Sequence, residues 1–213
     1  MSRTGPARRV VEQVRRRRQS SKAWLDRLYA AEYDPYHFDA NDYEAGKFGD
    51  LLGVLAARRY SRALEVGCSI GSFTERLAPH CDHLLAIDIA EAAVERARAR
   101  VAGLPQVKVE QRAVPGQLPP GPYDLVVCSD VLYFLTLRRL RRTLDQLAGM
   151  LAPGGSIVSL HWRGDLGAPT SGDAVHDEQK RAWSHLVHVA SHVRTDVGPA
   201  AAGYRLDRFD AMA

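Results

Sequence analysis

Residues 64–71 form a short apolar segment that ends in a turn bounded by two glycines, and this unit most constrains the fold. Residues 64–66 have the composition of a buried strand, and a helical pattern begins at Ser72. A second apolar segment, residues 83–87, ends in Asp88. A glycine turn between a strand and a helix, with an acid at the tip of the next strand, is typical of a nucleotide site on a parallel sheet.

The spacing of the glycines distinguishes between classes of nucleotide. A dinucleotide fingerprint reads G-x-G-x-x-G, whereas this chain has E-x-G-x-x-x-G from Glu65 through Gly67 to Gly71. The central glycine is absent, and no Lys-Ser/Thr pair follows to form a phosphate-binding loop. We therefore expect a ligand with a ribose but no phosphate, whose hydroxyls Asp88 binds. For this segment alone, a tight turn without any ligand remains an alternative.

Apolar segments and helical patterns alternate after residue 60. The expected strands are residues 63–66, 83–88, 106–111, 123–129 and 156–162, and the expected helices are residues 72–78, 90–101, 137–150 and 172–182. The alternating residues 186–193 and 204–209 predict a final hairpin. This order predicts an α/β fold with a parallel sheet and helices on both faces.

The first sixty residues follow a different pattern. Helical spacing begins near Ser21 and again over residues 41–59, with an aromatic turn between them in which Pro35 disfavours helix. We expect a helical cap over residues 21–60 of a single domain, residues 21–213. Residues 1–20 form a basic arm, expected to be disordered or a loose helix. The arginines of this arm could bind RNA phosphates. No aromatic residues are interleaved with them, however, so a solvated arm is favoured.

Composition bounds the class of protein. The 213 residues suffice for one domain with a sizeable core, and the net charge is only +4. No apolar run reaches the length of a membrane helix, and no secretory signal is recognisable, so we expect a cytoplasmic protein without a membrane partner. The three cysteines lack metal-ligand spacing, so we expect reduced thiols and no metal site.

Two segments resemble motifs of class I S-adenosylmethionine-dependent methyltransferases. Residues 65–71 resemble motif I, and residues 123–135, with D-L-V-V followed by a polar pair, resemble motif IV. The resemblance implies a Rossmann-like fold, a mostly parallel seven-stranded sheet with an antiparallel last strand, and S-adenosyl-L-methionine as the cofactor. It also implies cofactor contacts from Glu65, Gly67, Cys68, Gly71, Asp88, Ile89, Ala113, Val114 and Ser129.

One position departs from the pattern of that family. Members often carry an acid that binds the adenine amino group, whereas this chain has Val114 or, with the register shifted, Ala113. We therefore expect a backbone contact and apolar packing of the base, with Ile89 on its other face.

Methyl transfer requires alignment and a neutral acceptor atom rather than covalent catalysis. Asp130, beyond the fourth expected strand, would face the transferable methyl group and could orient an amine or take its proton. His161, at the end of the fifth strand, is the other candidate because its ordinary pKa suits neutral pH. The alternatives are a helix-capping role for Asp130 and a loop-bonding role for His161.

Residues 24–29, 34–38 and 43–48 resemble the nodulation protein S family. Its members are N-methyltransferases of the free amine of a deacetylated glucosamine in a chitooligosaccharide. The resemblance implies a small-molecule acceptor, specifically the amine of an amino sugar or related metabolite. The aromatic residues Tyr36, Tyr43, Tyr133 and Trp162 are then candidates for stacking on a sugar ring, with core packing as the alternative.

Two other functions remain open at this point. One is an RNA methyltransferase that uses the basic arm, although nucleic acid is the less favoured partner. The other is a cofactor-binding module without catalysis. The residues leave undecided whether nitrogen or oxygen is methylated, and they leave the oligomeric state open.

Overall fold

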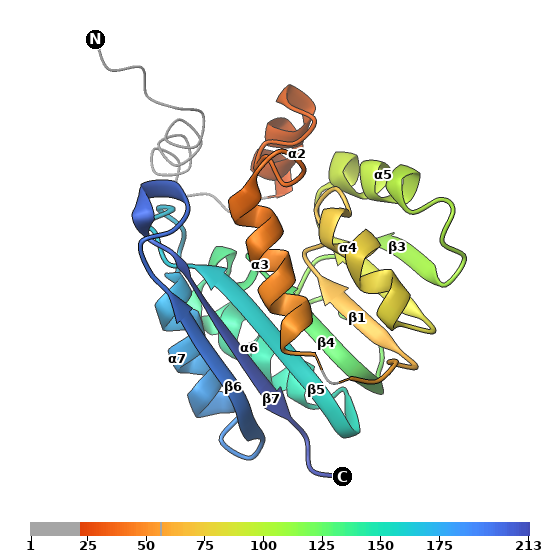
Figure 1. Cartoon of the computed structure of the whole chain (residues 1–213), viewed down its shortest axis with the longest axis vertical. Helices are drawn as coiled ribbons and strands as arrows, with labels where there is room; N and C mark the ends of the chain where they lie inside the picture. The colour runs from red at the N-terminus through yellow and green to blue at the C-terminus, as the bar shows by residue number, and fades with distance from the viewer. Residues whose placement is uncertain (1–21, 56) are drawn as a thin grey trace.

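A seven-stranded sheet in the order β3-β2-β1-β4-β5-β7-β6 organises the chain (Figure 1). The computed structural model describes residues 22–55 and 57–213. The strands are β1 (Ala63–Val66), β2 (Leu84–Asp88), β3 (Val107–Gln111), β4 (Tyr123–Ser129), β5 (Leu151–Trp162), β6 (Val187–Arg194) and β7 (Tyr204–Asp210). Strands β1 to β5 pair in parallel, and β7 runs antiparallel to both β5 and β6. The predicted Rossmann-like methyltransferase fold, with its antiparallel last strand, is confirmed.

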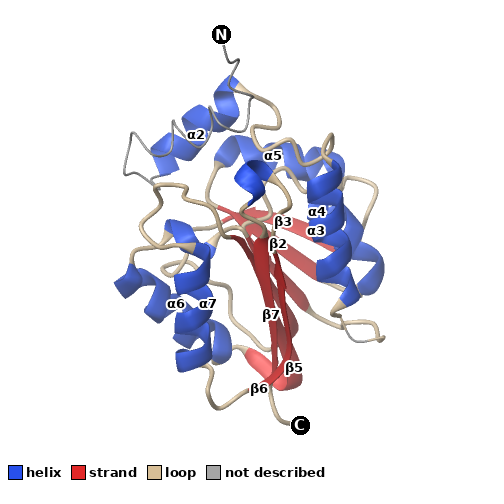
Figure 2. Cartoon of the chain, turned by 60° about the vertical axis from the view of Figure 1, so that its left-hand side comes forward, coloured by secondary structure: helices blue, strands red, loops and turns tan. Residues whose placement is uncertain are grey.

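Helices cover both faces of the sheet (Figure 2). They are α2 (Lys22–Ala31), α3 (Asp42–Gly53), α4 (Ser72–Leu77), α5 (Glu91–Arg100), α6 (Leu137–Ala148) and α7 (Gly172–Ala182). Apolar residues of α3 and α4 share one core cluster with β1, β4 and β5, whereas α6 and α7 lie on the opposite face. Burial on both faces explains the nearly continuous apolar run of β4.

Two expected boundaries differ from the structure by more than two residues. The helix expected over residues 41–59 ends at Gly53, where the N–H of Val54 bonds to carbonyls of the last turn. The strand expected from residue 156 begins at Leu151, because Leu151 already pairs with Tyr123 before the register shifts. The Pro-Gly-Gly sequence after it therefore lies within an irregular strand rather than a separate turn.

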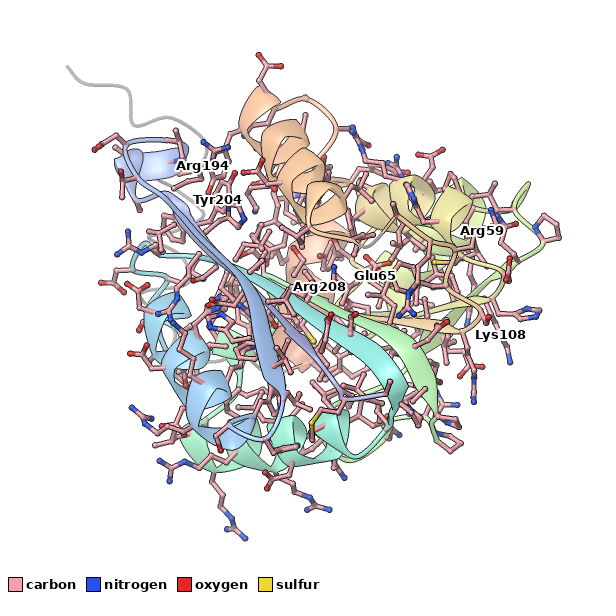
Figure 3. The ribbon with its side chains drawn as sticks, turned by 60° about the horizontal axis from the view of Figure 1, so that its bottom comes forward. Arg59, Glu65, Lys108, Arg194, Tyr204 and Arg208 are labelled. Atoms are coloured by element: carbon pink, nitrogen blue, oxygen red, sulfur yellow. The ribbon has the colours of Figure 1, made fainter. Side chains whose placement is uncertain are left out.

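The cap helix α3 is fixed to the sheet at its far edge. Asp50 of α3 accepts hydrogen bonds from the Tyr204 hydroxyl at 2.6 Å and from Arg194 Nε at 3.0 Å. Arg194 and Tyr204 are paired across the last hairpin (Figure 3). Arg208 of β7 donates to the carbonyl oxygen of Val54 at 2.7 Å. These contacts join the N-terminal cap to the last hairpin of the sheet.

The other cap helix, α2, is held on the opposite side. Arg96 of α5 donates to the carbonyl oxygen of Tyr29 at 2.6 Å, and Trp24 and Leu25 pack in a core cluster with α5. The cap therefore spans the cavity described below, with one helix attached on each side.

Several expectations concern the chain as a whole. No helix within residues 22–55 and 57–213 is long and apolar enough to cross a membrane. In the same residues, no group of three or more His, Cys, Asp or Glu side chains is arranged to hold a metal ion. The basic arm, residues 1–20, lies outside the described residues. The domain limits and the cytoplasmic location stay predictions.

Candidate active site

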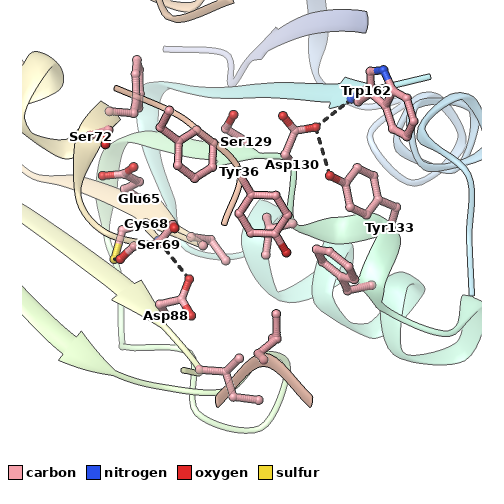
Figure 4. Close-up of a pocket in the computed structure, with 18 of the residues that line it drawn as sticks. Tyr36, Glu65, Cys68, Ser69, Ser72, Asp88, Ser129, Asp130, Tyr133 and Trp162 are labelled. Carbon is pink, nitrogen blue, oxygen red and sulfur yellow. Dashed lines mark hydrogen bonds between the residues drawn. The ribbon is translucent and has the colours of Figure 1, made fainter. Parts of the chain in front are cut away.

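A cavity of about 440 Å³ lies at the carboxyl ends of β1, β2 and β4, beneath the helical cap (Figure 4). Its volume is in the range of small-molecule sites. The strand order reverses between β1 and β4, and open α/β sheets bind their ligands at such a point. Most of the predicted site residues line this cavity.

The glycine turn after β1 forms one wall. Gly67 and Gly71 have φ angles of 83° and 82°, in the left-handed region that favours glycine. A Cβ atom added to Gly67 would lie 2.6 Å from the Cβ of Val131, so no larger residue fits there. The Tyr29 hydroxyl lies 2.5 Å from the Ser69 hydroxyl, which ties the turn to α2. The turn is thus held in a shape that brings its backbone to the cavity.

Asp88 closes the same end from β2. Its carboxylate accepts hydrogen bonds from the N–H groups of Ser69 at 3.0 Å and Ala90 at 2.9 Å. Each carboxylate oxygen retains a second lone pair that can accept from a ligand hydroxyl. Burial raises the pKa of Asp88 above its usual value, although the backbone donors oppose that shift.

Glu65 lies at the base of this wall. Its carboxyl group is buried, and Oε2 has no hydrogen-bond partner among the described residues. Burial raises the pKa of Glu65 to about 7. A buried acceptor without a partner beside the turn is a group that a bound cation or donor would satisfy.

The opposite end of the cavity carries a charged cluster of Asp130, Lys47 and Glu44. The Lys47 ammonium forms an ion pair with Asp130 and contacts both carboxylate oxygens of Glu44, at 3.1 and 2.9 Å. Lys47 and Glu44 are buried. Two carboxylates and one ammonium give the cluster a formal charge of −1, so it favours a cationic ligand.

Further donors fix the Asp130 carboxylate. Oδ1 accepts the backbone N–H of Trp162 at 2.7 Å and the Tyr133 hydroxyl at 3.2 Å (Figure 4). The backbone of Asp130 is in the left-handed region, at φ 50°, which an L-residue rarely adopts. The chain thus leaves the extended conformation directly after β4, and the Asp130 side chain lies in the cluster.

The cluster shifts the pKa values of its members. Burial lowers the pKa of Lys47, but the Asp130 and Glu44 carboxylates outweigh it, so the net pKa is raised and the ammonium stays charged. Burial raises the pKa of Glu44, and Lys47 only partly opposes that shift. Glu44 is therefore the carboxylate with the raised proton affinity.

Three predicted residues do not line the cavity. His161 is fully buried behind the wall, where its Nε2 atom accepts the N–H of Leu132 at 3.2 Å. This contact is the loop hydrogen bond that the sequence left open as an alternative. Gly71 packs against Ala97 and shapes the turn from behind, and the N–H of Ala113 is used by Gln117 Oε1.

The remaining predicted residues do line the cavity: Glu65, Gly67, Cys68, Asp88, Ile89, Val114, Ser129, Asp130, Tyr36, Tyr43, Tyr133 and Trp162. Sequence reasoning missed Glu44 and Lys47. They stand three residues apart on a helix that also presents Phe48 and Leu51 to the core. An acid–base pair beside the apolar stripe of a predicted helix was the signal that could have revealed them.

Comparisons with known proteins identify close relatives. Residues 18–193 match the family Nodulation protein S (NodS). Nodulation protein S of Sinorhizobium fredii is 34% identical over 174 residues, which are 76% of this chain and 69% of the relative. Nodulation protein S of Rhizobium tropici is 38% identical over 136 residues, 63% of this chain, and the match spans 57% of the relative's length.

A solved structure is similar over nearly the whole chain. The N-methyltransferase NodS from Bradyrhizobium japonicum WM9, in complex with S-adenosyl-L-homocysteine, superposes with a TM-score of 0.81 at 28% identity. The superposition covers 91% of this chain and 99% of that protein.

Proposed function

The chain belongs to the nodulation protein S family, and on that premise we propose that it transfers the methyl group of S-adenosylmethionine to the nitrogen of a small-molecule amine. The family is one of S-adenosylmethionine-dependent methyltransferases, and its member from B. japonicum is an N-methyltransferase that binds S-adenosyl-L-homocysteine. The acceptor we propose is the free amine of an amino sugar or a related metabolite.

The residues of one end of the cavity fit the cofactor. Only glycine fits at position 67, the Asp88 carboxylate has free lone pairs for ribose hydroxyls, and the buried Oε2 atom of Glu65 lacks a partner within the described part of the chain. Apolar side chains of Ile89 and Val114 would pack on the base, in place of the acid that related enzymes use. When bound, the cofactor supplies an electrophilic methyl carbon on a sulfonium group.

The other end of the cavity suits an amine. The net negative charge of the Asp130, Lys47 and Glu44 cluster attracts an ammonium group from water. An amine must lose its proton before it can attack a methyl carbon. Asp130 is held by three donors, whereas Glu44, among the described residues, accepts only from the Lys47 ammonium, and burial raises its pKa. We therefore assign Asp130 to orientation of the amine and Glu44 to proton acceptance.

Aromatic side chains complete this end. Tyr36, Tyr43, Tyr133 and Trp162 line the cavity around Asp130, so a pyranose ring would meet apolar ring faces beside the charged cluster. The same side chains would exclude water from the reacting nitrogen, which strengthens the electrostatic interactions there.

One observation carries the proposal. Asp88 and Asp130 line a single cavity, which Cys68 and Ser69 of the glycine turn also line (Figure 4). A carboxylate suited to a ribose and a carboxylate cluster suited to an ammonium thus face the same enclosed space. The RNA alternative is less favoured, since it rests on the basic arm alone, whereas the relatives named above are nodulation S proteins.

The experiment has two stages, both on the full chain. Calorimetry with S-adenosylmethionine and S-adenosyl-L-homocysteine tests the cofactor, and we expect saturable binding of both. Methyl transfer is then measured to chitooligosaccharides with one free amine, to the fully N-acetylated oligosaccharides as matched controls, and to RNA. We expect methylation of the free amine alone. Binding without transfer to any acceptor would favour the non-catalytic module, and absent binding would refute the proposal.

A further inference from the structure

A line of three fully buried polar side chains runs behind the cavity, away from the residues that face the ligand. His161 lies near the end of β5, His176 on α7 and Asp207 in the middle of β7. His161 Nδ1 lies 3.2 Å from His176 Nε2, and His176 Nδ1 lies 2.6 Å from Asp207 Oδ2. All three side chains have no exposed surface. Buried polar groups in such numbers require a reason, because apolar residues pack there at lower cost.

The geometry fixes where every proton in this line resides. The N–H of Leu132 can only donate, so His161 Nε2 accepts and carries no proton. Neutral His161 therefore carries its proton on Nδ1 and donates it to His176 Nε2. By the same reasoning, His176 carries its proton on Nδ1 and donates it to the Asp207 carboxylate, which can only accept. Burial lowers the pKa of both histidines, in agreement with two neutral rings.

The Asp207 end of the line is anchored in the last hairpin. His188 Nε2 lies 2.7 Å from Asp207 Oδ1, and Arg205 Nε donates to Oδ2 at 3.0 Å. Burial alone would raise the pKa of Asp207, but hydrogen bonds from His176, Ser191 and His188 outweigh it, so the pKa is lowered and the carboxylate stays ionised. The line therefore has a fixed acceptor at one end and a single backbone N–H at the other.

That backbone N–H belongs to the segment that forms the acceptor end of the cavity. Leu132 opens the short helical turn η2 (Leu132–Phe134), which carries Tyr133, whose hydroxyl bonds to Asp130. The ring of Tyr133 also packs edge-on against His161, with centroids 5.4 Å apart. Asp130 has a left-handed backbone, a conformation that persists only where its surroundings hold it.

We infer that His161, His176 and Asp207 are positioning residues that hold residues 130–133 in place through the Leu132 amide, and so aim Asp130 and Tyr133 at the methyl acceptor. The inference rests on the proposed function for its kinetic consequence only. None of the three touches the ligand cavity, so their effect reaches the reaction through this segment.

The first test needs no methyl acceptor. In the wild-type full chain, nitrogen-15 spectra of labelled histidine report which ring nitrogen carries the proton. We expect two histidines protonated on Nδ1, assigned by their loss in His161→Gln and His176→Gln. Protonation of either ring on Nε2 would overturn the assignment.

The second test measures amide hydrogen exchange at Leu132 and Tyr133, with S-adenosyl-L-homocysteine bound. His161→Leu removes both hydrogen bonds at similar bulk, and we expect exchange at Leu132 to rise about tenfold or more. His161→Gln retains one acceptor and one donor, so exchange there should return toward the wild-type rate. His185→Leu, at an exposed histidine, is the matched control and should leave exchange unchanged. An unchanged rate in His161→Leu, or equal acceleration throughout the molecule, would overturn the positioning role.

The third test is kinetic. With the amine acceptor of the proposed function, His161→Leu should lower kcat about tenfold and leave the Kd of S-adenosyl-L-homocysteine within about twofold, with rescue in His161→Gln. A fall in affinity without a fall in kcat would refute the inference. A wild-type chain that methylates nothing would refute the proposed function instead, and the first two tests would still decide the role of the three residues.

Discussion

The two ends of the cavity are built from different kinds of contact. At the cofactor end, Gly67 and Asp88 belong to one strand–turn–helix–strand unit, and backbone amides make most of the contacts. At the acceptor end, Lys47 meets Asp130 from a position 83 residues earlier in the chain, through side chains alone. A site formed by local backbone geometry therefore tolerates few substitutions. A site formed by side chains from distant segments depends instead on how a separate helix, here α3, packs on the sheet.

The largest expected effect is at the cofactor end. Gly67→Ala introduces a Cβ 2.6 Å from Val131 in a left-handed backbone, so we expect a loss of about 2–4 kcal/mol in stability and no measurable S-adenosyl-L-homocysteine binding by calorimetry. Gly46→Ala, in α3 with nothing within 4 Å, is the control and should stabilise the protein by about 0.5–1 kcal/mol. Binding within tenfold of the wild type in Gly67→Ala would show that the turn does not touch the cofactor.

Asp88→Ala tests the same end through a side chain. The change removes the acceptor for two backbone amides and for the ribose, so we expect affinity for S-adenosyl-L-homocysteine to fall about 100-fold. Calorimetry measures the affinity, and circular dichroism checks that the chain stays folded. Near-normal binding would place the ribose elsewhere in the cavity.

Asp130→Asn tests whether the acceptor end affects turnover rather than cofactor affinity. The variant keeps the shape but removes the charge that pairs with Lys47, so we expect kcat to fall about 10- to 100-fold with cofactor affinity changed less than about threefold. Steady-state kinetics and calorimetry on one preparation separate the two quantities. If affinity falls and kcat does not, Asp130 belongs with the cofactor contacts and the two ends are not distinct.

The smallest expected effect concerns the charge of Glu65. Its folded pKa of about 7 lies above the ordinary value of 4.5, so its stabilising proton is present at low pH and is lost as the pH rises through about 7. Glu65→Gln has no such proton to lose. Its free energy of unfolding, relative to that of the wild type, should therefore rise by about 1–2 kcal/mol between pH 5 and pH 8. Denaturant unfolding at both pH values measures the gain, and a pH-independent difference would contradict the raised pKa.

The parts of the fold that could be predicted from the sequence are those that local patterns of apolar residues and glycines define. The strands at 63–66 and 123–129 and the helix at 172–182 have the predicted bounds, because apolar runs and glycine turns define them over short distances. Element ends were less certain where backbone bonding decided them. Helix α3 ends at Gly53, although the expected helix ran to residue 59. Strand β5 begins at Leu151 because Leu151 pairs with Tyr123.

The site residues likewise divide into those that local spacing predicts and those that depend on tertiary packing. The glycine turn and Asp88 were predictable, since their spacing follows from one structural unit. Glu44 and Lys47 were harder to predict, because an acid–base pair on a predicted helix does not by itself show that this helix packs across the end of β4. His161 lies at a strand end as expected, but nothing in the sequence pattern showed that its ring is fully buried and lies within hydrogen-bond distance of the buried His176.

The attachment of α3 has an evolutionary consequence. This helix contributes Glu44 and Lys47 to the acceptor end, and its bonds to the body of the protein include those of Asp50 with Tyr204 and Arg194. Recombination that exchanged this one segment among homologues, with Asp50 retained, would alter which amines are selected and spare the cofactor turn. Substrate preference in such a lineage can diversify while the methyl-donor machinery is inherited intact.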